Sequence, residues 1–338
     1  MRRLFLTIIV TGSLLFLMPF FAHSDQDGVV RFATLPKRSP GHPEGIAADE
    51  KRNIYVATFD FAAQNIIHIF GRNGRLQDSI PLPTSPNFVV PLGLAFDTAG
   101  NLYVADFFNG DVLKFVPPFN SSSIPAATFD VCGGVPAGCG LNAITFDAGG
   151  DLYVSDSFGG NIFMIDLSSG TSSLFFADER LKPAPPPHGF PPFGANGLAF
   201  NANGSALFIA NTADDRILKL NLMGGSPTTL ETFAESINGA DGILFDEKGR
   251  LWVAANQADE VVALNANGRI VERRGSFEGV GRDGAPRGLL FPASIVLSHG
   301  SIFVTNTALV LTPAAGDEPE EDVTTFTVSR IPIGGVRH

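Results

Sequence analysis

The sequence predicts an all-β fold, a six-bladed β-propeller. Three observations predict it. A unit of about 50 residues recurs six times. Short apolar segments within each unit alternate with period 2, and the turns between them are rich in Asp, Asn and Gly. A chain of 338 residues otherwise suggests two domains. Because the repeats assemble into one ring, we expect a single propeller domain over residues 25–338.

Each copy of the unit holds an apolar strand, a turn, and a second strand that ends near Asp or Asn. The copies are EGIAADEKRNIYVATF (44–59), LGLAFDTAGNLYVADF (92–107), NAITFDAGGDLYVSDS (142–157), NGLAFNANGSALFIANT (196–212), DGILFDEKGRLWVAAN (241–256) and SIVLSHGSIFVTNT (294–307). Their first residues are 48, 50, 54, 45 and 53 positions apart. The turns need residues that tolerate positive φ, which explains their composition. A third strand follows in most copies, and a blade of four strands is expected.

The two ends of the mature chain predict how the ring closes. The segment GVVRFATL (28–35) precedes the first copy, and the last copy ends with its third strand, TTFTVSRIPI (324–333). Pairing of the N-terminal strand with the last blade would complete four strands and cover two exposed sheet edges. The acidic stretch 313–323 is expected to be a solvated loop.

The N-terminus has the pattern of an export signal. Two arginines precede an apolar run over residues 4–21, and Ala22-His23-Ser24 forms a small-x-small cleavage site. We therefore expect residues 1–24 to be a secretory signal peptide and the protein to be secreted or periplasmic. If the segment is retained, it would anchor the protein in a membrane by its N-terminus, outside the cytoplasm. In an exported protein, the two cysteines, Cys132 and Cys139, favour a disulfide bond.

Composition and motifs disfavour two classes of function. The net charge is −11 and the 23 Lys and Arg residues are scattered, whereas nucleic-acid binding requires clustered basic side chains. The chain has no Gly-x-Ser-x-Gly motif, so the serine nucleophile of an α/β-hydrolase is not expected.

The residue that opens each repeat is expected to lie beside the propeller axis, because the first strand of each blade lines the central channel. Reading down the repeats gives the column Glu44, Leu92, Asn142, Asn196, Asp241 and Ser294, in which five of the six side chains carry oxygen. An apolar strand would otherwise begin with a small or aliphatic residue, as it does at Leu92.

Two carboxylates in this column need a partner, because burying them near each other is unfavourable. The column contains no Lys or Arg that could neutralise Glu44 and Asp241. A divalent cation would do so, and hard oxygen ligands without His or Cys favour calcium. The sequence therefore predicts a Ca²⁺ site formed by Glu44, Asn142, Asn196 and Asp241. The alternative is that the two asparagines only bond backbone groups at strand ends.

At these residues the chain resembles the gluconolactonase and senescence-marker-protein family, six-bladed propellers related to paraoxonases, diisopropylfluorophosphatase and strictosidine synthase. The resemblance covers residues 40–310 and is strongest in ANGLAFNANGSALFIANT and ADGILFDEKGRLWVA. It implies calcium coordination by Glu44, Asn142, Asn196 and Asp241. The third repeat reads LNAITFD instead of the Asn-Asp-Gly triplet of sugar-lactone members, which disfavours a sugar lactone. The segment VADFFNGDVLKF also resembles NHL repeats, which are mostly binding modules.

The resemblance implies a monomeric, calcium-dependent hydrolase of a lactone or related ester, with a phosphotriester as the alternative substrate. Asp241 would activate water or attack as the nucleophile, and Glu44 would hold the metal. His42 and His188 lie in loops that lead into the first strands of their blades, and either is a candidate acid or base. Phenylalanines near the predicted rim, Phe107, Phe108 and Phe158, favour an apolar or neutral substrate. Two alternatives remain, a non-catalytic NHL-like propeller with structural calcium and a metal-free enzyme resembling strictosidine synthase.

Overall fold

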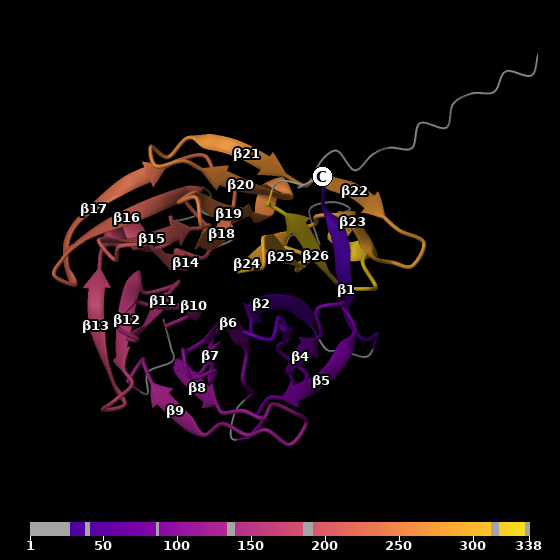
Figure 1. The fold of residues 1–338 in the computed structure, drawn as a ribbon, viewed down its shortest axis with the longest axis horizontal. Coiled ribbons are helices and arrows are strands. Elements are labelled where there is room, and N and C mark those ends of the chain that lie inside the picture. Colours follow the sequence, from indigo (N-terminus) through magenta and orange to yellow (C-terminus); the bar gives the residue numbers. More distant parts are fainter. Residues whose placement is uncertain are drawn as a thin grey trace, which may run out of the picture.

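The computed structural model describes residues 28–37, 41–85, 88–133, 139–184, 192–311 and 318–334. Over these residues the strands form six four-stranded antiparallel sheets and one two-stranded sheet. The six sheets stand in a ring around a central axis, as Figure 1 shows. The predicted all-β, six-bladed propeller is therefore confirmed. None of the helices in the described residues is long and apolar enough to cross a membrane.

Blades 1 to 3 follow the chain from the axis outward. Blade 1 contains β2 (His42–Ala48), β3 (Ile54–Phe59), β4 (Ile66–Phe70) and β5 (Leu76–Pro81). Blade 2 contains β6 (Pro91–Phe96), β7 (Leu102–Asp106), β8 (Asp111–Phe115) and β9 (Ala127–Asp130). Blade 3 contains β10 (Leu141–Phe146), β11 (Leu152–Asp156), β12 (Asn161–Asp166) and β13 (Thr171–Ala177), and is followed by the 3-10 helix η1 (Glu179–Leu181).

Blades 4 to 6 continue the ring. Blade 4 contains β14 (Ala195–Phe200), β15 (Ala206–Asn211), β16 (Arg216–Met223) and β17 (Ser226–Ala234). Blade 5 contains β18 (Ala240–Phe245), β19 (Leu251–Ala255), β20 (Glu260–Leu264) and β21 (Ile270–Arg274), with η2 (Asn256–Ala258) after β19. Blade 6 contains β24 (Pro292–Ser298), β25 (Ser301–Asn306) and β26 (Thr327–Pro332), with η3 (Pro319–Asp322) before β26. Each first strand contacts the first strand of the next blade, so these six strands line the axis.

The N-terminal strand closes the ring as predicted. β1 (Val30–Thr34) pairs antiparallel with β26, with Val30 opposite Arg330 and Thr34 opposite Thr327. It thereby supplies the outermost strand of blade 6. The two-stranded sheet of β22 (Phe277–Val280) and β23 (Pro286–Gly288) lies between blades 5 and 6 in the chain. The repeat pattern does not predict this hairpin.

A recurring aspartate fixes the turn between the first two strands of most blades. In blade 2, one oxygen of Asp97 accepts a hydrogen bond from the Asn101 backbone N–H at 2.8 Å. Its other oxygen accepts from the Tyr103 hydroxyl at 3.3 Å. The Tyr103 ring then packs edge-on against Phe146 of blade 3, with ring centroids 5.4 Å apart. The repeat thus encodes the turn and the packing of neighbouring blades together.

The first pair of strands has a register shift in every blade, over the residue that faces the axis and the residue after it. In four blades a glycine occupies the shifted position. A Cβ added to Gly45 would lie 2.1 Å from the carbonyl oxygen of Leu92, and one added to Gly197 would lie 2.2 Å from that of Asp241. Glycine therefore lets neighbouring first strands approach closely enough to narrow the axis.

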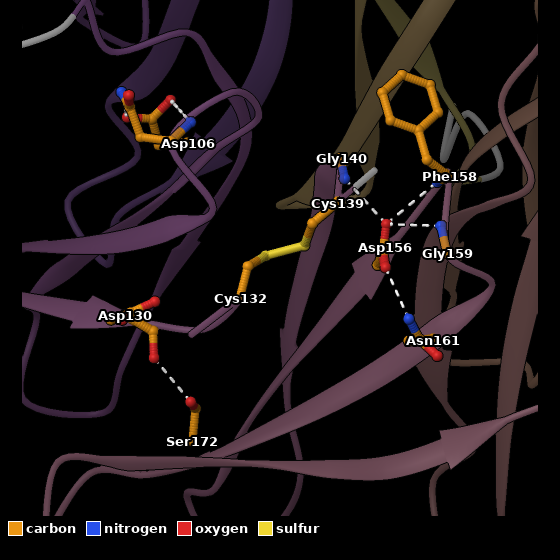
Figure 2. Close-up of a disulfide and its surroundings, with 11 residues drawn as sticks. Asp106, Asp130, Cys132, Cys139, Gly140, Asp156, Phe158, Gly159, Asn161 and Ser172 are labelled. Atoms are coloured by element: carbon orange, nitrogen blue, oxygen red, sulfur yellow. Dashed lines mark hydrogen bonds between the residues drawn. A yellow bond between two sulfur atoms is a disulfide. The ribbon is translucent and has the colours of Figure 1, made fainter. Parts of the chain in front are cut away.

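The Cys132–Cys139 disulfide is present, with 6.4 Å between the two Cα atoms. Figure 2 shows it beside the segment that leads into β10. The next residue, Gly140, donates its backbone N–H to Asp156 Oδ1 at 2.9 Å, and the same oxygen accepts from the Phe158 N–H at 3.1 Å. The Asp156 carboxylate therefore connects the segment after the disulfide to the turn that follows β11 in blade 3.

Candidate metal centre at the propeller axis

The four predicted metal ligands come together at the axis. Glu44 lies on β2, Asn142 on β10, Asn196 on β14 and Asp241 on β18, each on the first strand of its blade. All four are buried, with exposures of 7%, 4%, 3% and 6%, in the same order. They line a single cavity of about 60 Å³, together with Leu92 of blade 2. The column read from the sequence is correct in five of its six positions.

The sixth position is a correction, because Ala293 and not Ser294 occupies it. In blade 4, Ala195 pairs with Asn211, and Asn196 follows. In blade 6, Pro292 pairs with Asn306, so that Ala293 is equivalent to Asn196. The position after the column is glycine in four blades but serine here, which hid the shift in the sequence. Ser294 still lies nearby, and its hydroxyl is 3.4 Å from Glu44 Oε1.

The hydrogen bonds of the two asparagines fix which way their amides point. Asn142 Nδ2 lies 3.1 Å from the Ser157 hydroxyl, and that hydroxyl donates to the Ala195 carbonyl at 2.7 Å. Asn196 Nδ2 lies 2.9 Å from the Thr212 hydroxyl, which donates to the Ala240 carbonyl at 2.7 Å.

Each hydroxyl has given its only proton to a backbone carbonyl and must accept from the amide. The NH₂ group of each amide therefore faces the hydroxyl, and the amide oxygen points away from it. The amide oxygens of Asn142 and Asn196 remain as the acceptors that could contact a cation.

Each carboxylate has one buried oxygen without a partner. Among the described residues, no hydrogen-bond partner lies within reach of Glu44 Oε2 or Asp241 Oδ1. The second oxygen of Asp241 accepts from Asn256 Nδ2 at 3.0 Å. Buried acceptors normally have partners, so these two oxygens call for a positive charge or proton donor in the cavity.

The electrostatics of the two carboxyls agree with this. Burial raises the pKa of Glu44 well above its usual value, and the nearby Asp241 raises it further, while the Ser294 hydroxyl lowers it. Burial also raises the pKa of Asp241 to about 7, although hydrogen bonds from Asn256 and Asn196 oppose the rise. Both groups hold their protons unusually tightly because their negative charge is poorly solvated.

The donor set fits a hard divalent cation. Two carboxylates match two positive charges, and two amide oxygens add neutral ligands of the same type. In the described part of the chain, no three His, Cys, Asp or Glu side chains come together as a metal site. The candidate site therefore depends on the asparagines as much as on the acids, and its all-oxygen chemistry suits calcium better than a transition metal.

A second small cavity of about 70 Å³ lies along the axis. The residue two positions after each column residue contributes an aliphatic side chain to its lining, namely Ile46, Leu94, Ile144, Leu198, Ile243 and Ile295. Asn142 and Asn196 line this cavity as well, so the two asparagines lie between the two cavities.

Above the column the cavity is partly aromatic. Phe59, the last residue of β3, and Phe107, which follows β7, line it together with Phe193. Phe107 stands edge-on to Phe193, with ring centroids 5.9 Å apart. The rim residues Phe108 and Phe158 each pack against Phe107 with centroids 5.2 Å apart. The predicted aromatic surroundings of the site are present, with Phe107 as the member that lines the cavity.

The two candidate histidines have different outcomes. His188 lies outside the described residues. His42 is half-buried on β2, where its Nδ1 lies 2.8 Å from the Thr307 carbonyl oxygen and its ring packs on Phe326. Burial lowers its pKa. The ring does not line the cavity that holds Glu44, so His42 is placed to support Thr307, which does line it.

Two polar residues of the cavity were missed in the sequence. Asn256 holds Asp241, and the Thr307 hydroxyl donates to the Pro43 carbonyl at 2.6 Å, directly before Glu44. Both residues come directly after the second strand of a repeat, as Phe107, Ser157 and Thr212 do, and Phe59 at the end of β3 has the equivalent position in blade 1. A second column at this repeat position would have identified them.

The fold and the oxygen-rich column define a six-bladed propeller with a candidate cation site at its axis. A family model described as the SMP-30/Gluconolactonase/LRE-like region matches residues 193–274, a segment that contains Asn196 and Asp241. This match confirms the resemblance seen in the sequence. No curated protein matches the chain in sequence.

Several solved structures share the fold. A luciferin-regenerating enzyme has a TM-score of 0.65 at 14% identity, covering 91% of this chain and 95% of that one. A gluconolactonase from Xanthomonas campestris has a TM-score of 0.63 at 13% identity, covering 90% and 89%. A calcium-binding protein, regucalcin, from Agrobacterium tumefaciens has a TM-score of 0.65 at 16% identity, covering 90% and 94%. At these identities the comparison supports the propeller architecture.

Proposed function

We propose that the protein is a calcium-dependent hydrolase that opens a lactone or cleaves a related ester at the propeller axis. The observation that carries the proposal is the pair of unpartnered buried oxygens, Glu44 Oε2 and Asp241 Oδ1, in one cavity with two amide side chains. The family match over residues 193–274 and the gluconolactonase and calcium-binding structures of the same fold support it.

The four oxygen-bearing residues of the column have a role in this proposal. Glu44, Asn142, Asn196 and Asp241 would hold the cation, with the asparagine amides oriented by Ser157 and Thr212. Calcium, when bound, supplies Lewis-acid polarisation of the substrate carbonyl and stabilisation of the oxyanion. The cavity is buried and lined in part by phenylalanine, which strengthens such electrostatic effects by excluding water.

Asp241 is the candidate base. It lines the cavity together with the other three predicted metal ligands, and a carboxylate beside a bound substrate can accept a proton from water. It would remove a proton from water, the resulting hydroxide would attack the carbonyl carbon, and the C–O bond of the ester would break. The proton then passes to the leaving alkoxide, and the products are a carboxylic acid and an alcohol, joined in one molecule for a lactone. Direct attack by the Asp241 carboxylate is the alternative route.

The test is acid release in a pH-stat assay with a panel of lactones, aryl esters and a phosphotriester, first with calcium and then with a chelator. We expect hydrolysis that the chelator abolishes, and we expect Asp241→Ala to lose turnover and calcium binding together. Asp166→Asn, an exposed turn aspartate on β12, is the control.

The other outcomes identify the two alternatives. Chelator-insensitive activity would indicate a metal-free enzyme resembling strictosidine synthase. A calcium-dependent rise in melting temperature, without turnover of any compound, would indicate a binding propeller in which calcium is structural. Activity retained by Asp241→Ala would refute the site assignment.

We also propose that the mature chain is exported. The residues of the expected signal peptide, 1–24, lie outside the described part of the structure, but the Cys132–Cys139 disulfide supports export because such bonds persist in oxidising compartments. N-terminal sequencing of the protein from cell fractions tests this. A mature chain that begins near Asp25 in the extracytoplasmic fraction would support cleavage, and an intact N-terminus in the membrane fraction would support the anchored form.

A further inference from the structure

The cavity residues occur in pairs, and the pairs differ around the ring. In blades 3, 4 and 5, the column residue is hydrogen-bonded to the residue that follows the second strand of the same blade. These polar pairs are Asn142–Ser157, Asn196–Thr212 and Asp241–Asn256, with distances of 3.1, 2.9 and 3.0 Å. Blade 2 has Leu92 and Phe107 at the same two positions.

In blade 2 both members of the pair are apolar, and Leu92 and Phe107 therefore form an apolar sector of the cavity wall. Leu92 and Phe107 are buried and pack with Phe59 of blade 1 in one hydrophobic cluster. Phe193 and Leu309, which come from other blades, pack against the same cluster. The sector therefore faces the oxygen donors of blades 3 to 5 across one small cavity.

The position of this sector limits what it can do. The cavity of about 60 Å³ holds only a few heavy atoms. A substrate whose carbonyl reaches the oxygen layer must therefore extend its remaining atoms along the cavity wall toward the rim. Phe61 also lines the cavity and is 57% exposed, so the apolar wall continues from the buried cluster to solvent.

Building on the proposed function, we infer that Leu92 and Phe107 are specificity-determining residues that receive a hydrocarbon substituent of the substrate. The preferred substrate class is then a lactone or ester with an alkyl or aryl group next to the reacting carboxyl function. A polyhydroxylated lactone is disfavoured, because its hydroxyl groups would lose water against Leu92 and Phe107 without gaining hydrogen bonds.

The repeat itself provides the test variant. The double substitution Leu92→Asn/Phe107→Ser gives blade 2 the pair that blade 3 carries. We would measure kcat/KM for γ-lactones with unbranched alkyl substituents of increasing length, and for glucono-δ-lactone. For the unmodified protein we expect kcat/KM to rise about fourfold per methylene group over the first few methylenes. In the double variant we expect less than a twofold rise per methylene.

Two further variants make the result specific. Phe108→Ser removes a neighbouring phenylalanine that does not line the cavity, and it should keep the wild-type dependence on chain length. Leu92→Ala enlarges the sector without adding a polar group, and it should move the preference toward bulkier substituents even if the double variant does not fold. Calcium-dependent melting checks that each variant is folded.

Binding separates this inference from the proposed reaction. The same series is made as γ-lactams, which resist hydrolysis, and their affinity is measured by calorimetry with calcium present. Affinity that rises with chain length in the unmodified protein but not in the double variant supports the apolar sector, even if no lactone is hydrolysed. Equal chain-length dependence in the two proteins, in both turnover and binding, would overturn it.

Discussion

Replacing Asp241 by asparagine should stabilise the metal-free protein. Asp241 Oδ1 is buried without a partner in the described structure, and burial raises the pKa of this carboxyl from 3.8 to about 7. The folded state therefore binds the proton more tightly than the unfolded state, and stability is lost as the pH rises from the unfolded pKa through the folded pKa. Asparagine has nearly the same shape but no charge, and so avoids this loss.

The size of the effect follows from the two pKa values. The difference corresponds to about 4 kcal/mol at pH 8, using 1.36 kcal/mol for each tenfold change in proton affinity. At pH 5 the folded group is already mostly protonated, and the expected gain falls to about 2 kcal/mol. Calcium should reverse the order of stability at pH 8, because it stabilises the protein only where the intact ligand set binds it.

The assay is urea unfolding of the full mature chain at pH 5 and pH 8, with a chelator and then with calcium. Asp166→Asn is the control for the pH dependence, since the hydrogen bonds that lower the pKa of Asp166 to about 2 keep it ionised across this pH range. If metal-free Asp241→Asn is no more stable than the unmodified protein at pH 8, the reasoning about an uncompensated buried charge is wrong.

Two more predictions concern the blades themselves. Burial lowers the pKa of His68 on β4 to about 4, so the folded protein should lose about 2 kcal/mol of stability between pH 7 and pH 5, and His68→Gln should remove this loss in urea unfolding with calcium. A pH profile that is the same in His68→Gln would refute this. Gly197→Ala places a Cβ 2.2 Å from the Asp241 carbonyl oxygen and should lower the free energy of unfolding by about 1–3 kcal/mol and weaken calcium binding. Ala143→Gly, the reverse change at the equivalent position of blade 3, is the control and should have a much smaller effect.

The sequence was sufficient to predict the ring because each repeat contains its own turn and inter-blade contact. Asp97 and Tyr103 show this, since the same tyrosine bonds the turn aspartate and packs on the next blade. Repeated residues also occupy equivalent positions around the axis. One alignment of the repeats therefore located both Glu44, in the first repeat, and Asp241, in the fifth. The periodicity of the sequence carries this information directly.

The errors have a common physical origin in the register shift of the first strand pair. A bulge adds one residue to one strand without leaving a hydrophobic signal, and only the glycine after the column marks it. Where serine replaces glycine, at Ser294, the alignment slipped by one residue. The hairpin of β22 and β23 was missed for a different reason, since its strands have only four and three residues and are too short to show a period-2 pattern.

The six blades contribute different side chains to the axis. The column residues of blades 5, 6 and 1 are Asp241, Ala293 and Glu44, and their strands are neighbours around the axis. The smallest side chain of the column therefore lies between the two carboxylates. Leu92 lies on the other side of Glu44, in the next blade. The two neighbours of Glu44 thus differ in size, and this difference between blades 2 and 6 gives the site a direction that six identical repeats could not provide.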